Sequence, residues 1–159
     1  RTVGTLTDTS SQTSTLAGKI ISRFESLPDF APLRAVYLIW REPYMTVGAD
    51  TFIHDVMHWG GFENVYGDQT RYPEVSVDEL AERDVDVVFC SSEPFPFHQK
   101  DKFTADLKEA LPDTPVEVVD GQPFSWYGPR LLDTPSYLKD LRERLPTPRT
   151  ALSKKPPNR

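Results

Sequence analysis

Apolar residues recur along the chain at two spacings, and each spacing predicts its own kind of element. Near the N-terminus they recur every three or four residues up to Pro28, which predicts an amphipathic helix that ends there. Farther along, one segment of six residues is apolar at every position, as expected for a strand buried on both faces of a parallel sheet, and two further segments rich in valine also predict strands. The helical stripe consists of Leu16, Ile20, Phe24 and Leu27, and the predicted strands are 35–40, 86–91 and 116–120.

The segments between the predicted strands carry helical signals. Ile53, Val56 and Met57 share one face of a helix that ends at a glycine pair. A capping box precedes a short helix through Leu80, whereas the segment before Pro73 is expected to be irregular. Further helices are predicted at 99–111 and 129–145. Strands that alternate with helices predict an α/β fold, a small parallel sheet flanked by helices in a Rossmann-like lobe that follows a long helix.

Composition narrows the class of protein. The 159 residues fit one domain, and 38% hydrophobic with 26% charged residues is ordinary for a globular protein. The net charge is -6, and the lysines and arginines are scattered, so we expect no nucleic-acid partner. Cys90 lies in a predicted strand without other metal-ligand residues at a suitable spacing, so we expect a buried, inert thiol.

The three predicted strands are each followed by an aromatic segment, at 40–45, 93–97 and 120–127. Because the carboxyl ends of parallel strands meet at one edge of a sheet, we expect these segments to form one rim, where α/β sheets bind ligands. The alternative is that the aromatic side chains only close the end of the core. The candidate ligand-binding residues are Trp40, Arg41, Tyr44, Met45, Glu93, Phe95, Phe97, Trp126, Tyr127 and Arg130.

Two catalytic interpretations compete with binding. In "HDVMH", His54 and His58 lie one helical turn apart, as in a zinc motif, but no third ligand follows at the usual spacing. Ser91 or Ser92 with His98 and Asp101 could form a serine hydrolase site. No nucleophile-elbow motif surrounds either serine, and His98 and Asp101 stand where a helix is entered and capped, so we favour capping.

Four segments carry a resemblance to a known family. They are "IWREPYMTVGADTFIHDVMHWGGFENVYG", "YPEVSVDEL", "VDVVFCSSEPFPF" and "DGQPFSWYGPRLL", in that order. Together they resemble the helical-backbone substrate-binding proteins of ABC importers, which bind cobalamin, haem and iron-siderophore complexes. The similarity is greatest to the cobalamin branch and extends from the first predicted helix to Leu145.

The resemblance implies a division of the chain. Such proteins have two lobes joined by a long helix, with the ligand held between the lobes. Residues 1–28 would then be the interlobe backbone helix and 29–145 the C-terminal α/β lobe, with the N-terminal lobe, signal peptide and any lipid anchor upstream. The proline- and lysine-rich segment 146–159 is expected to be a disordered tail.

The resemblance also implies a function without enzymatic chemistry. The protein would capture a metal chelate outside the cytoplasm, a corrinoid such as cobalamin in the first place, otherwise haem or a ferric siderophore, and deliver it to a membrane permease. Trp40, Phe97 and Trp126 would pack on the ligand, and Arg41 and Arg130 would meet its anionic or amide groups. Glu42 and Glu93 are the candidates for docking to the permease. No catalytic cofactor and no protein-bound metal are expected.

A lobe without its partner would expose apolar surface. The stripe of Leu16, Ile20 and Phe24 and the rim segments would both be left in water. We therefore expect the isolated chain to self-associate through one or both of these surfaces.

Overall fold

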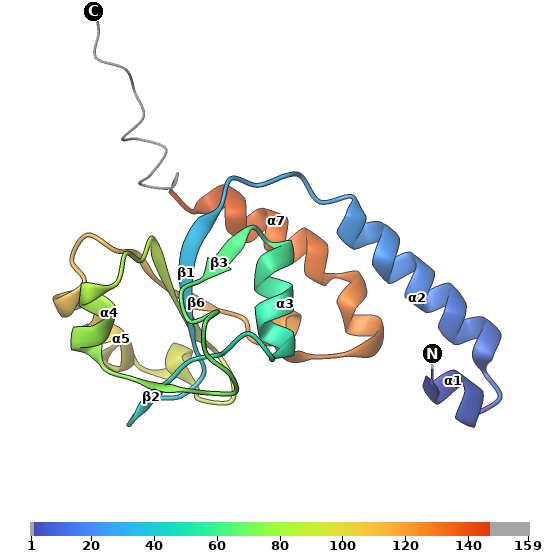
Figure 1. Ribbon diagram of the computed structural model, residues 1–159, viewed down its shortest axis with the longest axis horizontal. Helices are drawn as coiled ribbons and strands as arrows, with labels where there is room; N and C mark the ends of the chain where they lie inside the picture. Colours follow the sequence, from blue (N-terminus) through green and yellow to red (C-terminus); the bar gives the residue numbers. More distant parts are fainter. Residues whose placement is uncertain (1, 147–159) are drawn as a thin grey trace, which may run out of the picture.

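The computed structural model describes residues 2–146 and has a four-stranded sheet in the order β3-β1-β5-β6, with all strands parallel (Figure 1). The expected α/β fold is confirmed. The central strands are β1 (Leu33–Leu38) and β5 (Val87–Ser91), and the edge strands are β3 (Phe62–Asn64) and β6 (Val116–Val119).

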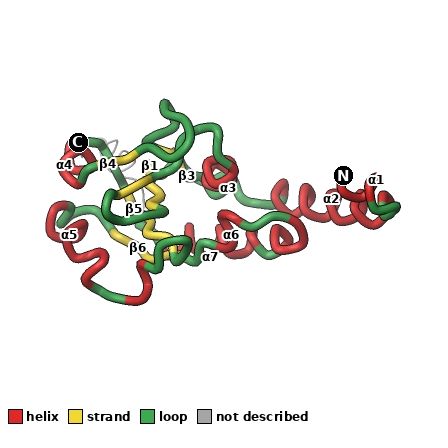
Figure 2. The backbone as a smooth tube through the Cα atoms, turned by 90° about the horizontal axis from the view of Figure 1, so that it is seen from below, coloured by secondary structure: helices red, strands yellow, loops and turns green. Residues whose placement is uncertain are grey.

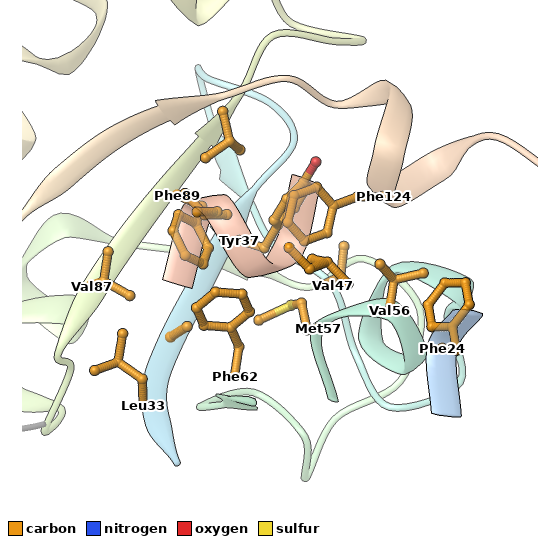
Figure 3. Packing of buried hydrophobic residues seen from close by; sticks show 14 residues of the cluster. Phe24, Leu33, Tyr37, Val47, Val56, Met57, Phe62, Val87, Phe89 and Phe124 are labelled. Atoms are coloured by element: carbon orange, nitrogen blue, oxygen red, sulfur yellow. The ribbon is translucent and has the colours of Figure 1, made fainter. Parts of the chain in front are cut away.

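Alternate residues of the central strands enter two separate cores. Tyr37 and Phe89 point into one core, whereas Leu38 and Cys90 point into the other. The first core contains α3 (Phe52–Trp59), α6 (Gln122–Ser125) and α7 (Thr134–Arg144), and the second contains α4 (Val77–Glu82) and α5 (Lys102–Ala110). Figure 3 shows the first core, where Phe62 and Phe89 meet edge to face at 4.9 Å between ring centroids. Burial on both faces explains the continuous apolar runs of the central strands.

The N-terminal segment forms an arm of two helices, α1 (Thr2–Leu6) and α2 (Ser10–Glu25). Figures 1 and 2 show that the N-terminal end of α2 projects away from the sheet, with α1 lying beside it. The C-terminal end of α2 joins the lobe through Phe24, which packs edge to face on Trp59, and through Arg23, which donates a hydrogen bond to the Leu132 carbonyl at 2.7 Å. The predicted helix is confirmed, and its stripe meets the lobe mainly at Phe24.

Three predictions of local structure were wrong. The segment expected to be irregular contains β3, a strand of three residues whose central Glu63 is exposed, so it has no apolar run. The expected helix over 129–145 is divided into η2 (Gly128–Leu132) and α7, because Pro135 occupies the first turn of a new helix. The short helix α6 lies within the third rim segment, where no helix was expected.

The remaining elements are short. They are β2 (Tyr44–Met45), β4 (Glu74–Val75) and η1 (Phe97–Gln99). Among residues 2–146, no helix combines the length and the apolar character that crossing a bilayer requires. The predicted tail lies outside the described residues, except for Pro146.

Candidate functional site

The first rim segment is a hairpin that follows β1. Ile39 and Met45 are joined by a backbone hydrogen bond of 2.9 Å, and β2 pairs with β4 in antiparallel fashion. The half-buried Met45 stands opposite Trp40, which is 41% exposed at the rim. The hairpin therefore presents Trp40 to solvent at the carboxyl edge of the sheet.

The second rim segment packs beside the first. The Phe95 amide donates to the Ile39 carbonyl at 3.3 Å, and the Phe95 ring meets Trp40 edge to face at 5.6 Å. Phe97 is only 1% exposed and lies beneath Phe95 and Tyr44. The expectation that Phe97 stacks on a ligand is therefore corrected, because its ring is enclosed by the protein's own aromatic side chains.

Arg41 and Tyr44 are occupied by contacts within the lobe. The Tyr44 hydroxyl contacts both carboxylate oxygens of Asp106 at 2.8 Å, and Arg41 forms an ion pair with the same carboxylate at 3.3 Å. Burial, followed by the hydrogen bond to Asp106, raises the pKa of Tyr44 above its ordinary value. Arg41 also pairs with the exposed Glu42. These contacts hold the hairpin against α5, which contains Asp106. The role of Asp106 could not be predicted from the sequence, because a single aspartate on a helix has no motif that indicates its partner.

The third rim segment is joined to the second by Glu93. One carboxylate oxygen of Glu93 accepts a hydrogen bond from the Trp126 indole at 2.6 Å and lies 3.1 Å from the Ser125 hydroxyl. Trp126 is 46% exposed, and the Arg130 guanidinium lies 5.3 Å from its ring centroid. The three segments predicted to share a rim therefore do so, linked by Trp40 with Phe95 and by Glu93 with Trp126.

Tyr127 points toward α3. The residue is 71% exposed, and its ring lies 4.4 Å from the Phe52 ring, between centroids. The exposed aromatic side chains of the rim are thus Trp40, Trp126 and Tyr127, with Phe95 half-buried among them. Three exposed rings on one edge of the sheet can cover a broad, flat ligand.

The contacts of the proposed catalytic residues do not assemble a hydrolase. Ser91 is fully buried, within 3.0 Å of the Tyr37 hydroxyl, and donates to the Glu93 carbonyl at 2.5 Å. Exposed His98 lies on η1. Asp101 is the residue before α5, but its side chain accepts no capping hydrogen bond from the helix, so the expected capping by Asp101 is not observed. Ser91 instead fixes the backbone of the second rim segment.

The two histidines of the zinc-like motif do not converge. His54 Nδ1 lies 3.2 Å from the Asn64 side-chain nitrogen, whereas His58 is exposed near the end of α3. No cluster of three or more His, Cys, Asp or Glu suited to a metal ion occurs among the described residues. Burial raises the pKa of the Cys90 thiol to about 12, in keeping with the inert cysteine expected from the sequence.

Two hollows lie beside α2 and α3, and the second extends to Phe52, the residue that packs against Tyr127 of the rim. One of about 590 Å³ lies between the end of α2 and the start of β3, and one of about 320 Å³ lies between α2, α3 and η2. Trp59 lines both, and exposed Ile21 lines the second. The exposure of Ile21 and Trp59 could not be predicted from the sequence, because it depends on how α2 packs against α3.

Comparison with known proteins finds similarity in structure alone. No protein-family model matches the sequence, and no curated protein matches it. The periplasmic haem-binding proteins RhuT of Roseiflexus sp. RS-1 and HutB of Vibrio cholerae superpose with TM-scores of 0.70 and 0.67 at 16% and 18% identity. The vitamin B12-binding protein BtuF of Vibrio cholerae superposes with a TM-score of 0.56 at 19% identity.

These matches define how much of the neighbouring folds the chain contains. They cover 89%, 88% and 87% of this chain, but only 58%, 60% and 55% of RhuT, HutB and BtuF. The chain therefore spans less than two thirds of the length of these neighbours. It has the α/β fold of part of a periplasmic binding protein.

Proposed function

We propose that the chain is the C-terminal lobe of a substrate-binding protein that delivers a metal chelate to an ABC importer. The observation that carries the proposal is the rim, where Trp40, Trp126 and Tyr127 are exposed on the carboxyl edge of the sheet. Residues 29–145 would form the lobe, and 1–28 would connect it to a second lobe across the ligand. The projection of α2 beyond the sheet is consistent with such a connecting helix (Figure 1).

The proposed ligand is a chelate with a broad ring face, a corrinoid in the first place and otherwise haem or a ferric siderophore. Solved neighbours are described as binding haem or vitamin B12, and another as belonging to an Fe3+-hydroxamate transport system. Trp40 and Trp126 supply flat apolar area, and Arg130 supplies a cation beside Trp126. No observation favours the hydrolase alternative.

Delivery would take place outside the cytoplasm, at the surface of a membrane permease. Glu42, whose side chain is 77% exposed, is the better candidate for pairing with a cation of the permease. Glu93 was an equal candidate in the sequence. Each glutamate has one oxygen engaged, Glu42 by Arg41 and Glu93 by Trp126, but Glu42 is exposed whereas Glu93 is half-buried.

Calorimetric titration of the full-length gene product with cyanocobalamin, haemin and ferrichrome tests the proposal. We expect saturable binding of one of these chelates, with a matching change in its visible spectrum and no chemical turnover. Absence of binding to all three, together with hydrolysis of ester or peptide substrates, would overturn it.

A further inference from the structure

The Glu93 carboxylate is committed to the third rim segment. Its Oε1 atom accepts a hydrogen bond from the Trp126 indole at 2.6 Å and lies 3.1 Å from the Ser125 hydroxyl, whose single proton can instead go to the Gly121 carbonyl at 2.8 Å. Hydrogen bonds to an ionised acceptor are shorter and stronger than those between neutral groups. Because Trp126 is 46% exposed, core packing alone does not fix its ring, and the hydrogen bond to Glu93 restricts its rotation.

The backbone that carries Glu93 is itself held in place. Ser91 donates to the Glu93 carbonyl at 2.5 Å, and the Gly121 amide donates to the Ser92 hydroxyl at 3.0 Å. A Cβ atom on Gly121 would lie 2.6 Å from Glu93 Cγ, which is too close for a normal contact. Only glycine at position 121 therefore lets the second and third rim segments come this close without a shift of their atoms. The carboxylate is therefore presented to Trp126 from a rigid support.

A cation lies over the face of the same indole. The Arg130 guanidinium is 5.3 Å from the Trp126 ring centroid, and its Nη2 atom donates to the Gln122 side chain at 2.6 Å. Arg130 is exposed, so its remaining N–H groups can meet an anion from solvent. Carboxylate, indole and guanidinium thus form one assembly of three groups.

We propose that Glu93 is a positioning residue, which holds the Trp126 indole beside Arg130 so that the two together meet a ligand's ring face and an anionic group at its edge. This inference rests on the proposed function and narrows the ligand class to chelates that carry a carboxylate or another anion. It also assigns Glu93 to the binding rim rather than to permease docking.

The first test needs no ligand. In a variant with Trp40→Phe and Trp59→Phe, Trp126 is the sole tryptophan, and its fluorescence reports the indole directly. Glu93→Ala should shift the emission to longer wavelength, lower the anisotropy and raise acrylamide quenching by roughly twofold, because the indole is released. Glu93→Gln, which keeps an oxygen acceptor, should restore most of the signal. Glu117→Ala, which removes an exposed glutamate of β6, is the matched control. Unchanged fluorescence in Glu93→Ala would overturn the proposal.

The second test is a double-mutant cycle on the full-length gene product, with haemin as the probe because its flat ring carries propionate carboxylates. Glu93→Ala should weaken binding about 5- to 10-fold, and Glu93→Gln less than about threefold. In a Trp126→Ala background, Glu93→Ala should change affinity by less than about twofold, because there is no indole left to position. An equal loss in both backgrounds would mean that Glu93 contacts the ligand itself, and would overturn the positioning role.

The two tests separate this inference from the proposed function. If Glu93→Ala releases the indole but haemin, cyanocobalamin and ferrichrome all fail to bind the unmodified protein, the proposed function is overturned while the holding of Trp126 by Glu93 stands. If a chelate binds but the indole is unaffected by Glu93→Ala, the proposed function stands and the positioning role is overturned.

Discussion

Trp126 on the rim and Trp59 on α3 are both 46% exposed, but they are held in different ways. The Trp126 indole donates to Glu93 and lies beneath Arg130. Trp59 has no hydrogen bond from its indole within residues 2–146, and its ring packs edge to face on Phe24 at 5.5 Å. The two tryptophans are therefore equally exposed, but Trp126 is held by a hydrogen bond and Trp59 by an apolar contact between helices.

The difference separates two kinds of surface. A polar anchor orients an exposed ring without burying it, which suits a site that must meet a small ligand in a defined pose. Trp59 instead lines two hollows beside α2, where Ile21 is 49% exposed, and an unanchored apolar surface of this kind suits burial against another polypeptide. We expect mutations on the rim to change ligand affinity and mutations beside α2 to change stability or association.

The largest effect is expected for Phe24→Ala. Phe24 is 6% exposed and joins α2 to the lobe, so removal of its ring should lower the free energy of unfolding by about 3 to 4 kcal/mol. Urea denaturation measures the loss, and hydrogen exchange should show that α2 opens before the sheet. Ile21→Ala, at an exposed position on the same helix, is the control and should cost under about 1 kcal/mol. If Phe24→Ala changed chelate affinity without lowering stability, the rim and the surface beside α2 would not have the separate roles expected of them.

Trp126→Ala should weaken chelate binding by about 1 to 3 kcal/mol, the usual cost of removing an aromatic anchor. Because Trp126 is 46% exposed, the melting temperature should change little. Calorimetry and thermal denaturation of the full-length gene product give both quantities. Unchanged affinity with a large fall in melting temperature would identify Trp126 as a core residue and remove the contrast with Trp59.

Trp59→Ala should show the reverse behaviour. Loss of its contact with Phe24 should lower the free energy of unfolding by roughly 1 to 2 kcal/mol, because half of the ring is already in water. Chelate affinity should stay within error of the unmodified protein, since Trp59 lies outside the three rim segments. A loss of affinity as large as that of Trp126→Ala would mean that the ligand extends to α3.

The smallest effect concerns self-association of the 159-residue chain. We predict association at micromolar concentration through the surface beside α2, where Ile21 and Trp59 are exposed. Ile21→Asp should raise the dissociation constant about three- to fivefold, under about 1 kcal/mol, because a charge replaces apolar area that association would bury. Sedimentation measures the constant, with Val118→Asp on the exposed edge of β6 as the control. A monomer that binds no hydrophobic dye would contradict the prediction.

The sequence alone determined the parallel sheet and the position of its rim. The predicted strands became β1, β5 and β6. The central strands β1 and β5 are mostly apolar because their alternate residues enter two cores, whereas the edge strand β6 has an exposed centre. The rule that parallel strands end at one edge then placed Trp40, Phe95 and Trp126 together without any knowledge of contacts. β3 was missed because an edge strand of three residues with an exposed centre has no such pattern.

Only the tertiary structure decided which rim residues face solvent and how they are held. Phe97 and Tyr44 carry the same aromatic signal as Trp126 but are 1% and 8% exposed, because Phe95 and Asp106 cover or bind them. The hydrogen bond from Trp126 to Glu93 spans 33 residues of sequence. Local sequence patterns indicate which face of each helix or strand is buried. Hydrogen bonds between two loops depend instead on how separate elements pack, so the bond between Trp126 and Glu93 could be seen only in the folded chain.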